Sequence, residues 1–137
     1  MNNKYITDLN NQFKDKVIVI TGSTQGLGKE TAKLIANRGA KGIVICGRQE
    51  DLGNAVKKEI EEIGCECLFV KADLFNVEDC RNIILMSDKE FGTINSLINV
   101  AGYTERGTVL STTLDNYEKN FNINTRAPFI LMQESIK

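Results

Sequence analysis

Short apolar runs and amphipathic segments alternate along the sequence. The runs Val17–Ile20 and Gly42–Cys46 are rich in β-branched residues and carry no charge, which predicts strands buried on both faces. A third strand is expected from about Cys65 to Ala72. Ser96–Asn99 is expected to form a short fourth strand. Longer segments that mix apolar, glycine and charged residues separate these runs.

The segments between the predicted strands have apolar residues at helical spacing. The first helix should end at Gly39 and the second at Gly64, because glycine favours helix C-termini. A third helix is expected from about Val77 to Phe91 and a last one from about Asp115. The positions that share a helical face are Leu27, Thr31, Leu34, Ile35 and Arg38 in the first helix; Leu52, Ala55, Val56, Ile60 and Ile63 in the second; Cys80, Ile83, Ile84 and Phe91 in the third; and Leu114, Tyr117 and Phe121 in the last.

This alternation predicts an α/β fold. Because the connections are short enough for right-handed crossovers, the sheet should be parallel, with helices on both faces. We expect a doubly wound, three-layer α/β/α arrangement of the Rossmann type with strand order 3-2-1-4. Ligands bind such sheets beyond the carboxyl ends of the strands, where the strand order reverses. That edge would gather residues 21–28, 46–48, 73 and 99–102.

The segment Thr21-Gly22-Ser23-Thr24-Gln25-Gly26-Leu27-Gly28 lies between the first predicted strand and the first predicted helix. A helix start carries unpaired N–H groups and the positive end of the helix dipole. Glycines let an anion approach the backbone where a Cβ atom would collide. The segment therefore predicts a phosphate-binding loop. A tight turn that needs glycine for its backbone angles is the alternative, and it would account for one of the three glycines.

Two familiar phosphate-binding patterns do not match this loop. A P-loop would need glycine at Ser23 and a hydroxyl residue at Glu30, although Gly28-Lys29 fits its second half. The dinucleotide pattern Gly-x-Gly-x-x-Gly would need glycines at Thr24 and Leu27. The spacing that remains is Thr-Gly-x-x-x-Gly-x-Gly.

Composition narrows the classes of function. The 137 residues are 42% hydrophobic and 26% charged, which is typical of one soluble globular domain. A formal net charge of -1 gives no basic face for nucleic acid, and no apolar run is long enough to span a membrane. Residues 1–15 lack the apolar core of a signal peptide and include acidic residues. We therefore expect a cytoplasmic protein with a surface arm at 1–15 and one domain at 16–137.

The cysteines and histidines also constrain the chemistry. The four cysteines contain no Cys-x-x-Cys pair, so we interpret them as small apolar side chains and expect neither a metal site nor a disulfide. No histidine is present, which removes the usual general base and every Ser-His or Cys-His nucleophile. Any redox or transfer chemistry would have to come from a cofactor.

Three segments together resemble the short-chain dehydrogenase/reductase family. The glycine loop is similar to the cofactor loop of that family, and Asp73-Leu74 resembles its adenine-contacting pair. Asn99-Val100-Ala101-Gly102 resembles its Asn-Asn-Ala-Gly segment, with Val100 in place of the second asparagine. The resemblance covers nearly the whole chain but only the cofactor-binding half of family members. It implies a nicotinamide-dependent oxidoreductase, a small carbonyl or alcohol substrate, and a homo-oligomer in the full-length form.

The end of the second strand predicts the type of nicotinamide cofactor. An acidic residue there binds the ribose 2′-hydroxyl of NAD, whereas an arginine accommodates the 2′-phosphate of NADP. This chain has Gly47-Arg48, so we expect NADPH to be preferred over NADH. The hydroxyl of Ser23 is expected to be a further donor to the phosphate. A solvated surface position for Arg48, and a simple turn for Asp73, are the alternatives. The candidate cofactor-binding residues are Gly22, Ser23, Thr24, Gln25, Gly26, Leu27, Gly28, Arg48, Asp73, Leu74, Asn99, Ala101 and Gly102.

The last helix contributes one candidate catalytic residue, Asn124. The segment 117–124 resembles the segment that ends in the family's helix asparagine, and we align that residue with Asn124. The resemblance implies that the main chain of this asparagine holds a water of the proton relay. Pro128 has no N–H for the carbonyl of Asn124, so the helix should be distorted there. An ordinary polar helix position is the alternative for Asn124.

The proton donor that the resemblance implies, a tyrosine in Tyr-x-x-x-Lys, is absent from this chain. Tyr5, Tyr103 and Tyr117 are followed four residues later by Leu9, Gly107 and Phe121. We therefore expect an incomplete domain that continues after Lys137, with an open sheet edge at the fourth strand and no turnover by the 137 residues alone. A non-catalytic NADP-binding or regulatory module is the alternative function.

Overall fold

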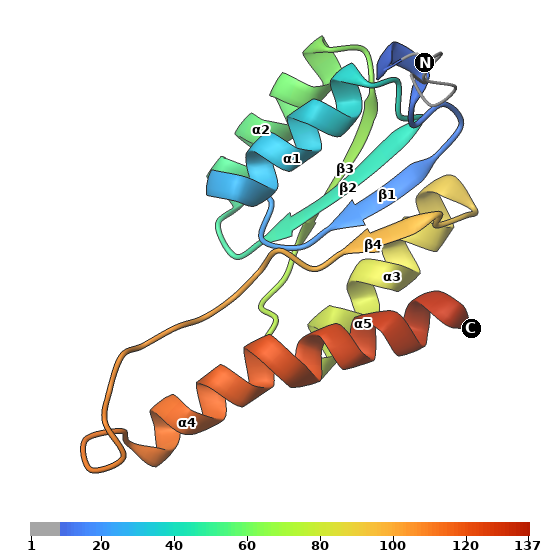
Figure 1. The fold of residues 1–137 in the computed structure, drawn as a ribbon. Helices are drawn as coiled ribbons and strands as arrows, with labels where there is room; N and C mark the ends of the chain where they lie inside the picture. The colour runs from blue at the N-terminus through green and yellow to red at the C-terminus, as the bar shows by residue number, and fades with distance from the viewer. Residues whose placement is uncertain (1–8) are drawn as a thin grey trace, which may run out of the picture.

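The computed structural model describes residues 9–137. Four parallel strands form one sheet in the order β3-β2-β1-β4, as the sequence predicts (Figure 1). The strands are β1 (Val17–Ile20), β2 (Gly42–Gly47), β3 (Glu66–Lys71) and β4 (Ser96–Ile98). Because every neighbouring pair of strands is parallel, all four strands run toward one edge of the sheet, where Gly47 of β2 pairs with Lys71 of β3. We call that edge the carboxyl edge.

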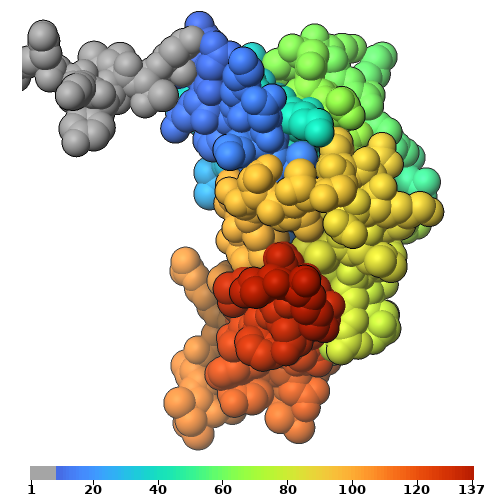
Figure 2. Space-filling view, turned by 90° about the vertical axis from the view of Figure 1, so that its right-hand side faces the viewer, coloured from blue at the N-terminus to red at the C-terminus, as the bar shows by residue number. Residues whose placement is uncertain are grey.

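Helices cover both faces of the sheet and complete the predicted three layers (Figure 1). The helices are α1 (Gly26–Asn37) and α2 (Glu50–Glu62) on one face, with α3 (Val77–Phe91) and α5 (Ala127–Ile136) on the other. Figure 2 shows α5 in red beside α3 in yellow-green. Helix α4 (Leu114–Phe121) precedes α5 and projects, together with the loop before it, away from the sheet (Figure 1).

The core lies on both faces of the two central strands. Every residue of β1 is at most 1% exposed, and alternate residues of this strand face opposite layers. Ile18 and Ile20 pack with the residues beneath α1 and α2, whereas Val19 packs with those beneath α3 and α5. The uncharged, β-branched composition of these strands is the cause of this double burial.

In α1 and α2 the buried residues coincide only in part with the positions that helical spacing places on one face. In α1 the buried residues are Gly28, Ala32, Ile35 and Ala36, while Leu27 and Leu34 are exposed. In α2 the buried residues are Gly53, Val56 and Ile60, while Leu52 and Ala55 are exposed. The reason is a close approach to the sheet: a Cβ atom at Gly53 would lie 2.1 Å from the ring of Phe69. Small residues therefore occupy the positions where each helix contacts the sheet. The larger apolar side chains of the helix point partly away from this contact. In α3 the predicted face is confirmed, because Cys80, Ile83 and Ile84 are buried.

Helices α1 and α2 end at the glycines that the sequence predicts. Gly39 and Gly64 have φ angles of 82° and 98°, left-handed values that favour glycine and end α1 and α2. The distortion predicted near Pro128 is also present. Residues Asn122–Arg126 form a π-helical segment between α4 and α5, in which the N–H of Ala127 donates to the carbonyl of Asn122.

Residues 9–15 of the predicted N-terminal arm lie at the surface, and Phe13 attaches them to the domain. Its ring packs against the core beneath α1 and α2, and its N–H donates to the carbonyl of Arg38 at 3.0 Å. Residues 1–8, which include Tyr5, lie outside the part that the structure describes. Among the helices of residues 9–137, none has the length and apolar character needed to cross a lipid bilayer.

All four cysteines are buried and free. Burial raises the pKa of Cys46 and of Cys67 to about 12, so both thiols are protonated and unreactive at neutral pH. Within residues 9–137, no three acidic, cysteine or histidine side chains gather closely enough to hold a metal ion.

Candidate functional site

The carboxyl edge brings together the ends of all four strands. The loop 21–28 follows β1, Arg48 follows β2, and Asn99 follows β4. Asp73 is the second residue after β3. Parallel pairing of β1 with both β2 and β4 fixes these ends side by side. Residues up to 80 positions apart in sequence thus reach one site.

Thr21 joins the ends of β1 and β4. Its hydroxyl oxygen accepts the backbone N–H groups of Val100 and Ala101, both at 3.1 Å, and its own N–H donates to the carbonyl of Ile98 at 3.0 Å. The side chain is 1% exposed. Sequence reasoning assigned no role to Thr21. The position of Thr21 directly after a buried strand was the available signal, because a hydroxyl there can accept backbone N–H groups of residues that lie just beyond the end of the neighbouring strand.

The three glycines of the loop have two different roles. Gly22 has a φ of 61°, and a Cβ atom there would lie 2.8 Å from Cα of Ala101. A Cβ atom at Gly28 would lie 2.2 Å from the carbonyl oxygen of Gly22. These two glycines therefore let the loop, α1 and the end of β4 pack together. Gly26 has a φ of 54° and would direct a Cβ atom into open space, so its backbone is the part that a ligand can approach.

The N-terminus of α1 is not neutralised by the protein. The N-cap residue Gln25 makes no side-chain hydrogen bond to the helix, and the first turn contains no acidic residue. By contrast, α2 begins with Glu50 and Asp51, and α4 is capped by Thr113. The first-turn N–H groups and the positive helix end at α1 together favour an anion at the carboxyl edge.

The structure corrects the role predicted for Ser23. Its hydroxyl is fully buried, donates to the carbonyl of Ile20 at 2.6 Å and accepts the N–H of Cys46 at 3.0 Å. It therefore links β1 to β2 and does not face solvent, where a phosphate would have to lie. The prediction that this hydroxyl is a donor to the 2′-phosphate is wrong. The cause is the hydrogen bond from Cys46 of β2, a residue 23 positions away in sequence, and no local sequence pattern indicates this bond.

The neighbouring residues of the loop complete this packing. Thr24 fills the space beside Gly47, where a Cβ atom would lie 2.6 Å from the Thr24 methyl group. Gln25 and Leu27 are exposed beside the start of α1. The residue at the end of β2 is therefore small because Thr24 occupies the volume of its side chain.

A hollow of about 320 Å³ lies at the ends of β2 and β3, and we call it the Arg48 hollow. Its lining residues are Arg48, Lys71, Ala72, Asp73 and Asp79. Among residues 9–137, Arg48 makes no hydrogen bond or ion pair, so its guanidinium is available to a ligand. The structure thus brings together two residues, Arg48 and Asp73, that sequence analysis assigned to one cofactor.

Asp73 is partly used by the fold. One of its carboxylate oxygens accepts the N–H of Phe75 at 3.0 Å, and its own N–H donates to Asp79 at 2.8 Å. This turn agrees with the simpler interpretation of Asp73 as a strand terminator. The second carboxylate oxygen is without a partner among the described residues and remains available. Leu74, which follows, is half-buried against the core under α3.

Residues 99–102 border the same edge. Asn99 is exposed, and Ala101 is half-buried against Gly22. A Cβ atom at Gly102 would meet only the side chain of Asn124, at 3.7 Å, so the backbone here is also accessible. The predicted cofactor-binding residues therefore line one continuous edge, apart from the buried side chain of Ser23.

Asn124 holds the loop that follows β4. Its amide oxygen accepts the N–H of Tyr103 at 2.8 Å, and its amide nitrogen donates to the carbonyl of Tyr103 at 2.7 Å. Both polar groups of the side chain are thus used by the backbone of one residue. The main-chain carbonyl of Asn124 lacks its α-helical donor, because that donor would be the nitrogen of Pro128.

The two described tyrosines are not arranged as proton donors. The hydroxyl of Tyr103 donates to Glu105 at 2.6 Å, and this hydrogen bond raises the pKa of Tyr103 above its ordinary value. Tyr117 is exposed and packs its ring against Phe121, with centroids 4.5 Å apart. A raised pKa makes a tyrosine a weaker acid, which is the opposite of what acid catalysis requires.

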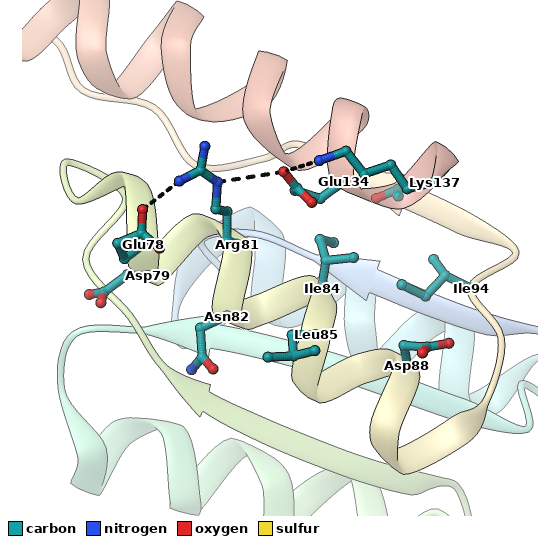
Figure 3. A pocket seen from close by; sticks show the side chains of 11 residues that line it. Glu78, Asp79, Arg81, Asn82, Ile84, Leu85, Asp88, Ile94, Glu134 and Lys137 are labelled. Atoms are coloured by element: carbon teal, nitrogen blue, oxygen red, sulfur yellow. Dashed lines mark hydrogen bonds and ion pairs between the residues drawn. The ribbon is translucent and has the colours of Figure 1, made fainter.

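A larger hollow, of about 860 Å³, lies between α3 and α5 (Figure 3). None of the predicted site residues lines it. Its cations are already paired, since Arg81 contacts Glu78 and Glu134, and Lys137 also contacts Glu134 (Figure 3). Among its charged lining residues only Asp88 has no side-chain partner in residues 9–137, so the hollow offers no free cation to an anionic ligand. The carboxyl edge is therefore the better candidate site, although its hollow is smaller.

Comparison with known proteins identifies the class. The sequence profile of the short chain dehydrogenase family matches residues 16–137, and the chain belongs to this family. It is 30% identical over 125 residues to an uncharacterized oxidoreductase of Thermotoga maritima, covering 91% of this chain and 49% of that protein. It is 31% identical over 126 residues to 2,5-dichloro-2,5-cyclohexadiene-1,4-diol dehydrogenase LinX of Sphingobium indicum, covering 92% and 50%.

Solved structures give the same result. A short chain dehydrogenase of Burkholderia cenocepacia, in complex with NADP, has a TM-score of 0.87 and 28% identity, and the match covers 92% of this chain and 51% of that one. A blue fluorescent protein from a metagenomic library, in complex with NADPH, has a TM-score of 0.82 and 28% identity, covering 90% and 51%. The chain thus spans about half the length of the relatives it matches.

Proposed function

We propose that the protein that contains this chain is an NADP-dependent oxidoreductase, and that this chain supplies its cofactor-binding half. The observation that carries the proposal is the Arg48 hollow: an unpaired guanidinium and a partly free carboxylate lie together at the carboxyl edge that α1 also faces. Solved relatives in complex with NADP or NADPH support this interpretation. The substrate that we propose is a small carbonyl compound or alcohol.

The residues present fit a nicotinamide dinucleotide. The uncapped start of α1 and the open backbone at Gly26 suit the negative charge of a pyrophosphate. Asp73 offers one carboxylate oxygen to an amino group such as that of adenine, and Gly102 leaves its backbone accessible. These groups would hold the cofactor without any large side chain in its place.

The preference for NADPH over NADH follows from Gly47 and Arg48. The guanidinium of Arg48 can bind a phosphate with two parallel hydrogen bonds. An acidic side chain at position 47, which would favour NADH, does not fit beside Thr24, because its Cβ atom would lie 2.6 Å from the Thr24 methyl group. Both the charge and the packing at the end of β2 therefore support NADP(H).

When bound, NADP(H) supplies or accepts the hydride that interconverts a carbonyl and an alcohol. The carbonyl oxygen must gain a proton as the hydride arrives, and neither Tyr103 nor Tyr117 is placed as the acid. The main-chain carbonyl of Asn124, which cannot accept from the nitrogen of Pro128, is proposed to hold a water that relays this proton. The acid itself is proposed to lie in a part of the protein other than residues 9–137.

The test compares binding with turnover. The complete natural protein is titrated with NADPH and NADH and assayed for NADPH oxidation with a panel of ketones and aldehydes. Residues 1–137 are assayed in parallel. We expect tighter binding of NADPH by both samples if both fold, and turnover by the complete protein only. Binding without turnover by the complete protein would favour the non-catalytic NADP-binding module, and equal rates from both samples would contradict the assignment of the acid.

A further inference from the structure

The end of β3 presents a second cation to the site of the expected 2′-phosphate. Lys71 is the register partner of Gly47, so the two residues lie side by side where β2 and β3 end. Register partners in a parallel pair direct their side chains to the same face of the sheet. Lys71 therefore projects from the face covered by α1 and α2, beside Gly47.

Lys71 and Arg48 line the same hollow. The two carboxylates in that hollow are engaged by backbone N–H groups, since Asp73 accepts from Phe75 and Asp79 accepts from Asp73. Neither carboxylate forms an ion pair with either cation in residues 9–137. The hollow therefore contains two cations that form no ion pair with its own acidic residues.

The partner of Lys71 lies outside the hollow and holds it weakly. Its ammonium lies 3.5 Å from a carboxylate oxygen of Glu50, the first residue of α2. The side chains are 64% and 62% exposed, respectively. Exposed ion pairs of this kind contribute little to stability, so Lys71 can exchange this carboxylate for another anion at small cost.

We propose that Lys71 is a second cation of the 2′-phosphate site and that it leaves Glu50 when the phosphate binds. The proposal rests on the proposed function, in which Arg48 selects NADPH. A 2′-phosphate carries close to two negative charges at neutral pH, and one guanidinium neutralises only half of that charge. Lys71 supplies the other half, and Glu50 competes with the phosphate for the same ammonium.

The experiment measures dissociation constants of the complete natural protein for NADPH and NADH by fluorescence titration. Lys71→Met should weaken NADPH about fivefold to tenfold and change NADH less than about twofold. Glu50→Gln should strengthen NADPH about twofold to threefold, because the competing carboxylate is gone. The matched control is Lys58→Met, which removes an equally charged lysine from an exposed pair with Glu62 on α2. It should change neither constant.

Several results would overturn this proposal. Unchanged NADPH binding by Lys71→Met would show that the lysine does not reach the phosphate, and an equal loss for NADPH and NADH would assign Lys71 to the adenosine part or to the fold. Weaker NADPH binding by Glu50→Gln would mean that the ion pair supports the site. Thermal melting checks folding, and Lys71→Gln replaces Lys71→Met if the latter does not fold. If Arg48→Met removes the NADPH preference and Lys71→Met does not, the proposed function stands and this inference falls. If the natural protein has no NADPH preference, the proposed function itself fails.

Discussion

Helices α1 and α3 both begin at the carboxyl edge of the sheet, but their N-termini are treated differently. The side chain of Asn76 accepts the N–H groups of Glu78 and Asp79, and these two residues place negative charge in the first turn of α3. The N-cap residue of α1, Gln25, makes no such bond, and its first turn has no acidic residue. Both helix ends carry a similar partial positive charge, so only the groups that neutralise it differ.

This difference separates a structural helix start from a binding one. At α3 the protein satisfies the N–H groups and the charge by itself, which leaves nothing for a ligand. At α1 it uses Gly22 and Gly28 to pack the loop tightly and leaves Gly26 beside open space. The residues between each strand and the following helix show the same contrast. The segment after β1 contains three glycines, and the segment after β3 contains Asp73 and Asn76. Substitutions at and near the carboxyl edge test this contrast, beginning with the largest expected effect.

Gly28→Val should abolish cofactor binding. A Cβ atom at this position would lie 2.2 Å from the carbonyl oxygen of Gly22, and neither backbone segment can move without separating α1 from the loop. We expect affinity for NADPH to fall by at least about a hundredfold and stability to fall by about 3 kcal/mol. Gly22→Val should behave similarly, because its Cβ atom would lie 2.8 Å from Cα of Ala101.

Titration with NADPH and denaturant unfolding measure these two effects. Gly64→Ala, at the C-terminus of α2, is the matched control, because a Cβ atom there meets nothing within 4 Å and only the left-handed backbone is strained, which costs about 1 kcal/mol. A folded Gly28→Val protein with the affinity of the natural protein would show that this glycine is only a turn residue.

Arg48→Asp should reverse the cofactor preference. The substitution replaces a phosphate-binding cation with a carboxylate that repels phosphate and accepts from a ribose hydroxyl. NADPH should bind roughly a hundredfold more weakly, while NADH binds as well or better. The control is Lys41→Asp, which makes the same change of charge at the opposite end of β2. Equal affinities for the two cofactors before mutation would contradict the assignment of the phosphate site.

An acidic residue in the first turn of α1 should make this helix start resemble that of α3. Leu27 is 74% exposed, so Leu27→Glu fits without a clash. The helix should gain about 0.5 kcal/mol from the favourable interaction with its dipole, whereas NADPH and NADH should both bind about tenfold more weakly. Leu27→Gln, which has the same shape and no charge, should do neither.

The opposite result is expected at α3. Asn76→Ala removes the cap and should cost about 1 kcal/mol of stability, while cofactor affinity stays within about twofold. Thermal melting and titration of both variants give the comparison. The contrast between the two helix starts would be refuted if Leu27→Glu left cofactor affinity unchanged, or if Asn76→Ala lowered it as much as Leu27→Glu.

Much of the fold was predictable because it depends on local patterns. The β-branched runs predicted β1 and β2, and Pro128 predicted the interruption of the last helix beside Asn124. The exposure of Leu27 and Leu34 could not be predicted, because helical spacing does not report how closely a helix approaches the sheet. Gly28 and Ala32 make that approach, and the larger side chains are turned toward solvent.

The site was predictable as an edge but not as a set of contacts. The order of the strands and the glycine loop were enough to place Arg48 and Asp73 near each other. The burial of Ser23 depends on Cys46, and the pairing of Asn124 with Tyr103 joins residues 21 positions apart, with α4 between them. These long-range hydrogen bonds arise from the assembled fold, and no pattern of residue types specifies them.

The smallest predicted effect concerns the charge of Lys29 near the start of α1. Its ammonium lies 2.7 Å from Glu59 of α2, which also accepts from Lys33 at 2.9 Å, so the acidic partner comes from the neighbouring helix and not from the first turn itself. Hydrogen bonds from Lys29 and then Lys33 lower the pKa of Glu59 below its ordinary value. A carboxyl whose pKa is lower in the folded state stabilises the fold above its unfolded pKa and loses this effect as the pH falls through the folded pKa.

Glu59→Gln should therefore cost less than about 1 kcal/mol at pH 7, because the pair is partly exposed. The difference from the natural protein should shrink as the pH is lowered below about 4.3, where glutamate begins to protonate in the unfolded chain. Urea unfolding at a series of pH values from neutral to acid measures it, and 1 M salt should reduce it further. A difference that stays constant down to acid pH would mean that Glu59 acts through packing and not through charge. Cofactor affinity should not change, since the uncapped N–H groups of α1 are left as they are.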